Sequence, residues 1–132
     1  MNKRWLSWMI LAGLVLASFT PIAAVEAAGN GQWDTKGTYN LYYRSAYGWW
    51  DTANVKSTGG GFRIKGALYN VDYELWEYDP GPGNDDLIGH HYQVTWDPYG
   101  VFNVNRFVDG SNNRAELYVK TYVDAGSVKF WD

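Results

Sequence analysis

The sequence predicts an all-β fold, a small antiparallel β-sandwich of about seven or eight strands that follows a cleaved signal peptide. Several segments alternate apolar and polar residues with a period of two, and 15 glycines and 4 prolines separate such segments. No segment has the pattern of a long amphipathic helix. With 132 residues, 18% aromatic and 19% charged, the chain fits one globular domain rather than a disordered or multidomain protein.

The first 28 residues have the layout of a secretory signal peptide. Lys3 and Arg4 precede an apolar run from Leu6 to Phe19, and small residues follow at 23–28. A membrane anchor is the alternative, but the run of about 14 residues is shorter than the roughly 20 that a spanning helix needs. The sequence therefore predicts a signal peptide at 1–28 and one β-sandwich domain at 29–132, secreted or associated with the cell surface, with no transmembrane segment in the mature chain.

The segments Gly61–Tyr69 and Val71–Trp76 alternate apolar with polar side chains, as half-buried strands do. Asn70 lies between them and suits a tight turn, so they are predicted to form a hairpin. Ile88–Trp96 alternates in the same way and predicts a third strand.

Val101–Val108 and Arg114–Val123 flank the turn-rich segment 109–113, which predicts a second hairpin. Thr38–Arg44 and Ser127–Trp131 are short enough for single strands at the two ends of the domain.

The loop after Trp76 concentrates hard oxygen donors. Glu77 and Asp79 lie two positions apart, and Asp85 and Asp86 return at the start of the next strand. Calcium takes six to eight oxygen ligands, and a loop that folds back on itself can present carboxylates from both ends to one ion. The four residues are therefore predicted calcium ligands, with an ordinary solvated acidic turn as the alternative.

The run from Val71 to Val94 resembles the third calcium loop of C2 domains. The resemblance rests on Trp76-Glu77-Tyr78-Asp79 and then Asp85-Asp86-Leu87-Ile88-Gly89, and it covers about 24 of the 132 residues. It implies an eight-stranded antiparallel sandwich whose loops at one end hold calcium, often against phospholipid headgroups. The family usually has aspartate where Glu77 stands, and its earlier ligand loop is matched here only by Asp51.

Three tryptophans are predicted ligand-binding residues: Trp49, Trp50 and Trp76. Neighbouring residues of a strand face opposite sides, so at most one of Trp49 and Trp50 can enter the core. The other can stack on a sugar, insert at a membrane interface or anchor a protein contact. An aromatic cluster folded over the sheet edge is the alternative.

Several function classes are disfavoured. The net charge of −3 gives no basic excess for nucleic acid. The absence of cysteine removes disulfides, thiolate metal sites and cysteine nucleophiles. No serine elbow, phosphate-binding glycine loop or zinc-binding helix motif occurs, and we expect a protein that is not an enzyme.

Two functions from different classes remain. The first is a secreted binding module with a calcium-organised loop that engages a cell-surface ligand, either a lipid headgroup or a polysaccharide. The second is a secreted protein-interaction protein, such as an antibacterial factor or an inhibitor of an extracellular enzyme.

Overall fold

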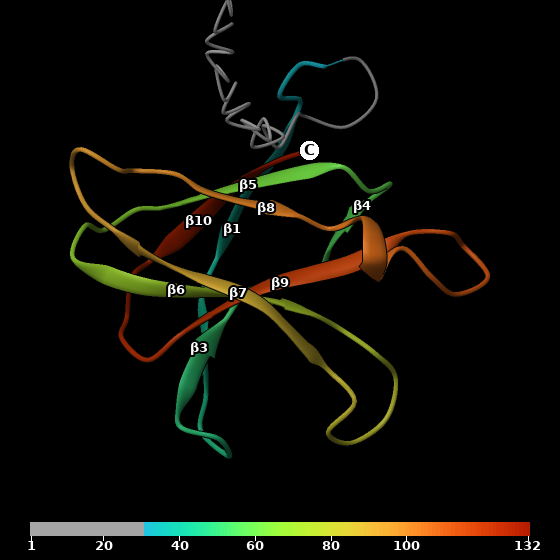
Figure 1. Ribbon diagram of the computed structural model, residues 1–132. Helices are drawn as coiled ribbons and strands as arrows, with labels where there is room; N and C mark the ends of the chain where they lie inside the picture. The colour runs from blue at the N-terminus through green and yellow to red at the C-terminus, as the bar shows by residue number, and fades with distance from the viewer. Residues whose placement is uncertain (1–30) are drawn as a thin grey trace, which may run out of the picture.

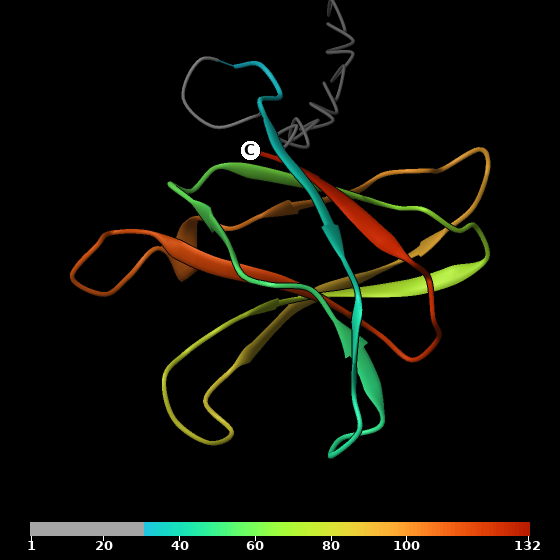
Figure 2. The same ribbon diagram turned by 180° about the vertical axis from the view of Figure 1, so that it is seen from behind.

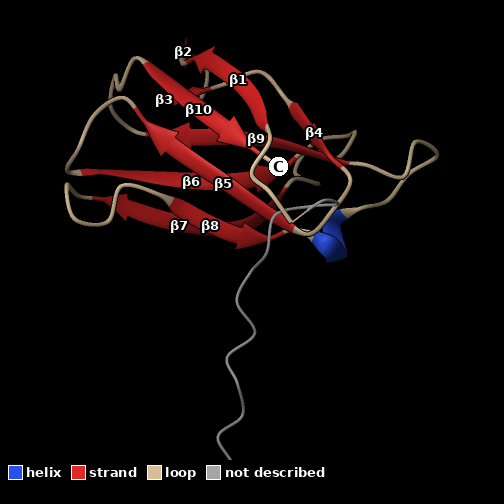
Figure 3. Ribbon diagram, turned by 90° about the horizontal axis from the view of Figure 1, so that it is seen from above, coloured by secondary structure: helices blue, strands red, loops and turns tan. Residues whose placement is uncertain are grey.

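The computed structural model describes residues 31–132, and the predicted signal peptide at 1–28 lies outside them. Ten strands and one short 3-10 helix form the regular structure of the described part, in two antiparallel sheets (Figure 3). The predicted all-β class is confirmed. Within residues 31–132, no helix has the length and apolar character that crossing a membrane requires.

The smaller sheet contains four strands, and Figure 1 shows three of them, β5, β8 and β10, above β6, β7 and β9. Its strand order is β1 (Thr35–Asn40), β10 (Ser127–Trp131), β5 (Gly61–Gly66) and β8 (Gly100–Asn103). The terminal strand predicted at Ser127–Trp131 is confirmed.

The larger sheet contains six strands. Its order is β2 (Tyr42–Arg44), β3 (Trp49–Asp51), β9 (Ala115–Thr121), β6 (Val71–Glu77) and β7 (Asp86–Gln93), and β4 (Val55–Ser57) pairs with β9 beside β3. Every pairing in both sheets is antiparallel.

One hydrophobic core lies between the inward faces of the two sheets. The smaller sheet contributes Phe62, Ile64 and Phe130, and the larger sheet contributes Tyr73 and Leu75, all at most 1% exposed. The period-two alternation places these side chains on one face of each strand. Burial of each stabilises the fold by about 1.5–3 kcal/mol, which lets a chain without cysteine fold by packing.

The hairpin predicted at Gly61–Tyr69 and Val71–Trp76 is wrong, because β5 and β6 belong to different sheets. Both segments bury an apolar face in the same core, so they face each other across it instead of pairing side by side. The crossing is tight: a Cβ at Gly66 would lie 1.9 Å from Cζ of Tyr73. Buried Gln93 of β7 accepts a hydrogen bond from the Gly66 N–H at 2.7 Å and donates to its carbonyl at 2.9 Å, which ties the two sheets together.

The second predicted hairpin is also wrong. β8 pairs with β5, whereas β9 lies between β6 and β3 in the other sheet. Between them the chain forms the 3-10 helix η1 (Asn105–Phe107), and the Phe107 side chain of this helix is buried in the core. Only an isolated bridge between Asp109 and Arg114 joins the two flanks.

The strand predicted at Thr38–Arg44 is divided between the sheets. Figure 2 shows the chain continuing from the upper sheet to the lower one at this point. The division falls at Leu41, which is buried in the core and whose N–H donates to the Gly126 carbonyl at 2.9 Å. One segment thereby serves as β1 in one sheet and β2 in the other.

Candidate functional site

The β6–β7 hairpin holds the acidic loop, at the lower right of Figure 1. Glu77 ends β6 and Asp86 begins β7, and these two residues are paired across the strands. The register shifts between Leu75 and Trp76, which pair with Gly89 and Leu87, so Ile88 has no partner. This bulge sets the two carboxylates opposite each other at the mouth of the loop.

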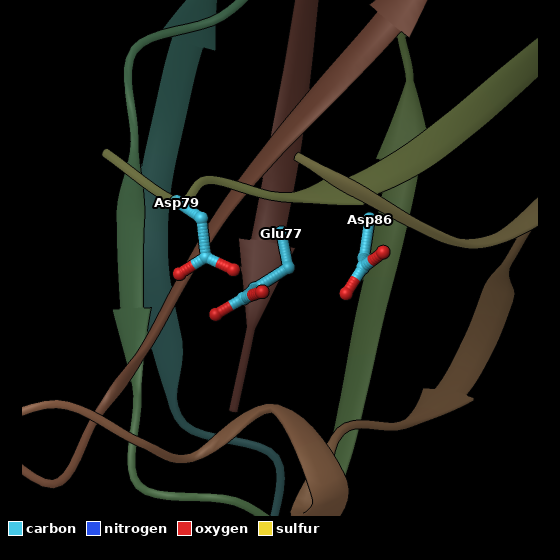
Figure 4. Close-up of side chains that lie close together, drawn as sticks. All are labelled: Glu77, Asp79 and Asp86. Atoms are coloured by element: carbon cyan, nitrogen blue, oxygen red, sulfur yellow. The ribbon is translucent and has the colours of Figure 1, made fainter. Parts of the chain in front are cut away.

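Glu77, Asp79 and Asp86 form a compact acidic cluster. Each offers a carboxylate oxygen, and these oxygens lie within 4.8 Å of one another. Figure 4 shows the three side chains pointing to the same side of the hairpin. Three of the four predicted ligands are therefore brought together.

Glu77 is the unusual member of the cluster. It lies on the core-facing side of β6 with only 2% of its surface exposed. Among the described residues its side chain has no hydrogen-bond or ion-pair partner. Burial, and then the negative charges of Asp79, Asp109, Asp86 and Asp85, raise its pKa from 4.5 to about 7. A cation in the cluster would supply the missing partner.

Asp85 does not join the cluster, contrary to the sequence prediction. Its Oδ1 accepts the Asp79 N–H at 3.0 Å, and its Oδ2 accepts the Tyr118 hydroxyl at 2.8 Å. Burial and then this hydrogen bond raise the pKa of Tyr118. Asp85 fixes the loop to strand β9 instead of facing the other three carboxylates.

Asp51, the residue matched to an earlier calcium loop, also lies elsewhere. Its Oδ1 accepts from Arg44 Nε at 2.6 Å and its Oδ2 from Trp49 Nε1 at 3.2 Å. It is not part of the group of carboxylates that could share one ion. The cluster therefore draws its side-chain oxygens from a single hairpin.

A groove of about 690 Å³ lies on the outward face of the larger sheet. Its aromatic lining comes from three elements: β3 with its preceding turn, β6 with the acidic loop, and β9. The lining side chains include the rings of Tyr47, Trp49, Trp76, Tyr78 and Tyr118. Two of the three predicted tryptophans thus share one concave surface.

Trp50 faces away from the groove. It packs against the core and contacts Tyr43, with ring centroids 5.2 Å apart. Trp49 instead stacks on Tyr47 at 4.7 Å with the ring planes 12° apart. The opposite orientation of neighbouring tryptophans is confirmed, and Trp50 is a packing residue rather than a lining residue.

Lys120 lies beneath the groove and was not predicted from the sequence. Its Nζ is 4.4 Å from the Trp49 ring centroid, 4.0 Å from that of Trp76 and 3.4 Å from Glu74 Oε2. Glu74 also accepts from Trp76 Nε1 at 2.8 Å. Lys120 thus fixes both tryptophans and has its charge balanced. The sequence gives one indication of this role: Lys120 lies two positions from both Tyr118 and Tyr122, on the polar side of the alternating pattern.

The acidic loop contributes residues to both the acidic cluster and the aromatic groove. It carries the cluster residue Asp79, and Tyr78, Gly81, Pro82 and Asp85 line the groove. Asn84 Nδ2 donates to the Pro80 carbonyl at 2.7 Å and closes the loop on itself. Any ion held by the cluster would therefore act on one wall of the groove.

Together these features define an all-β domain of two antiparallel sheets, with an acidic cluster at one hairpin and an aromatic groove on one outward face. The chain belongs to the YndA family: the family described as "YndA coiled coil domain" matches residues 35–131. YndA of Bacillus subtilis (strain 168) is 37% identical over 130 residues, covering 92% of this chain and 93% of that protein. No solved structure matches the chain. Residues 31–132 contain no α-helix, so the coiled coil of the family's description is not found there.

Proposed function

We propose that this chain is an exported, non-enzymatic β-sandwich module that binds a polysaccharide in the aromatic groove, with calcium organising the loop that forms one wall. The observation that carries the proposal is the double use of that loop, which supplies both the acidic cluster and part of the groove lining. Calcium binding and glycan binding would then be coupled through one short segment.

The groove suits a sugar chain because it combines flat rings with polar groups that fix orientation. Its cations are already compensated, Arg44 by Asp51 and Lys120 by Glu74. A neutral polysaccharide meets no unpaired charge there, whereas an anionic lipid headgroup would have to compete with these carboxylates. We therefore favour the polysaccharide over the lipid headgroup.

The cluster suits calcium because its donors are all carboxylate oxygens, which hard cations prefer. Glu77, Asp79 and Asp86 would hold the ion, which would neutralise carboxylates that otherwise repel one another. The burial of Glu77 beside two further carboxylates, with no cationic side chain of the described residues paired to it, is the specific reason to expect an ion rather than a solvated turn. The ion would fix the direction of Tyr78 and of the glycine-rich part of the loop.

Calcium binding is tested by calorimetric titration of the purified protein. We expect binding that is lost in Asp79→Asn/Asp86→Asn and retained in Asp97→Asn/Asp124→Asn, which removes two carboxylates from elsewhere. Equal heats in the two double variants, or none in the unchanged protein, would contradict the ion site.

Glycan binding is tested by affinity electrophoresis in soluble neutral polysaccharides, with and without calcium. We expect retardation that Trp76→Ala and Tyr47→Ala reduce and that calcium strengthens. Trp96→Ala is the matched control, because Trp96 is 84% exposed and lies outside the groove. Circular dichroism checks that each variant is folded. At position 49 the variant is Trp49→Phe, because phenylalanine keeps an aromatic ring above Lys120.

The same control addresses the second candidate, a protein-interaction function. A tryptophan as exposed as Trp96 is the type of side chain that anchors protein contacts. If Trp96→Ala abolished capture of an extracellular protein while groove variants did not, the protein-interaction function would replace glycan binding.

A further inference from the structure

The outward face of the smaller sheet carries positive charge without negative charge. Its strands present outward Arg63 and Lys65 from β5 and Lys129 from β10, and no outward position of β1, β5, β8 or β10 holds an aspartate or glutamate. This arrangement stands out in a chain whose net charge is −3.

The two lysines are held next to each other. Lys65 and Lys129 are direct partners across β5 and β10. Like charges in directly opposite positions destabilise a sheet. Neither lysine has an ion pair within residues 31–132, whereas Lys36, Lys56 and Lys120 each do. Lys65 Nζ lies 5.5 Å from the Tyr99 ring centroid and Lys129 Nζ 4.9 Å from that of Trp131, so within residues 31–132 each ammonium contacts an aromatic ring but no carboxylate.

Arg63 extends the positive surface along β5. Its guanidinium carbon lies 4.7 Å from the Trp33 ring, 4.7 Å from the Tyr99 ring and 4.5 Å from the Trp131 ring. Among residues 31–132 its buried Nε has no hydrogen-bond partner. The rings hold the side chain in place by cation–π contacts, which leave its positive charge uncompensated.

We propose that this face, made by Arg63, Lys65 and Lys129, binds a linear polymer of phosphate groups. The charge sign selects an anion, and a guanidinium matches phosphate oxygens better than a point charge does. Arg63 and Lys65 are two residues apart on one strand, or roughly 7 Å, and Lys129 lies beside Lys65 on the neighbouring strand. The three cations are therefore spread over a surface that suits several linked anionic groups rather than a single ion.

Other anionic surfaces fit less well. The apolar outward side chains of these four strands are Val101 and Trp131, and the Trp33, Tyr99 and Trp131 rings are held against Arg63, so few apolar groups are left to insert into a lipid bilayer. The Tyr99 and Trp131 rings already contact Arg63, which disfavours stacking with nucleic-acid bases.

The test is a titration of the purified protein with linear polyphosphate of defined length, in a chelator so that no calcium bridges acidic residues to the polymer. We expect binding that weakens with added salt and falls about tenfold or more in Lys65→Glu/Lys129→Glu. Lys65→Gln/Lys129→Gln should give a smaller loss and guards against misfolding of the charge-reversed form.

The matched control is Arg106→Glu/Arg114→Glu, which makes the same change in net charge at two exposed residues away from this face. It should bind polyphosphate like the unchanged protein. An equal loss in the control would show a general charge effect and overturn the proposal. Absence of polyphosphate binding, or tighter binding to phosphatidylglycerol vesicles or single-stranded DNA, would also overturn it.

Discussion

Both outward faces of this domain place a cation among aromatic rings, but only one of them balances the charge. Lys120 lies against Trp49 and Trp76 with Glu74 at 3.4 Å, whereas Arg63 lies among three rings with no carboxylate on its face of the sheet. The rings alone therefore do not indicate a ligand. The presence or absence of a carboxylate distinguishes a neutral groove from a positive surface.

The largest expected effect concerns the ion pair of Lys120 and Glu74 on the outward face of the larger sheet. Lys120→Ala leaves Glu74 in a largely buried position without its cation, and we expect the free energy of unfolding to fall by about 3 kcal/mol. Glu74→Gln/Lys120→Met should recover a large part of this loss. Arg63→Met should cost only about 1 kcal/mol, because no carboxylate is left unpaired. Urea denaturation measures all three, and equal losses for Lys120→Ala and Arg63→Met would remove the distinction between the faces.

The acidic cluster extends the comparison to uncompensated negative charge. Because the pKa of Glu77 is raised from 4.5 to about 7, the unfolded chain ionises this carboxyl at a lower pH than the folded chain does. Without calcium, stability should therefore fall as pH rises between about 4.5 and 7, by on the order of 3 kcal/mol. Glu77→Gln should remove this dependence and be the more stable protein at pH 8.

Thermal melts in a chelator at several pH values measure this effect. Calcium at pH 8 should restore stability to the unchanged protein but not to Glu77→Gln, since the ion requires the ionised carboxylate. A flat pH profile in the unchanged protein would show that Glu77 has a partner in solution.

The smallest effect concerns the unbalanced lysines. Lys129→Gln removes one member of the like-charge pair with Lys65, and we expect a gain of a few tenths of a kcal/mol at low salt. The gain should disappear as salt screens the repulsion. A loss of stability at low salt would mean that the pair is already neutralised within the protein.

The sequence predicted what depends on local pattern. Strand periodicity identified the all-β class, and the proximity of Glu77, Asp79 and Asp86 followed because one hairpin carries all three. The orientation of Asp85 could not be predicted, because its hydroxyl partner, Tyr118, lies 33 positions away. The two wrong hairpins have the same origin: alternation shows that a segment buries one face but not which sheet it joins.

The groove was predicted only in part for a related reason. Trp49 and Trp76 were candidates from their residue type, but Lys120 became important through pairing with Glu74 on one side and Asp51 on the other. Only the central position of β9 creates that neighbourhood. The positive surface of Arg63, Lys65 and Lys129 likewise requires β10 beside β5, and these strands come from the end and the middle of the described chain.

The Gln93 side chain has a mechanical consequence. The side-chain amide of Gln93 makes two hydrogen bonds to the Gly66 backbone, at 2.7 and 2.9 Å. They connect one sheet to the other inside the core, where no water competes. Sliding of the two layers would break both bonds at once. Two different molecules captured on the opposite outward faces would thus be held at a constant spacing and angle, and the domain would act as a stiff coupling between them.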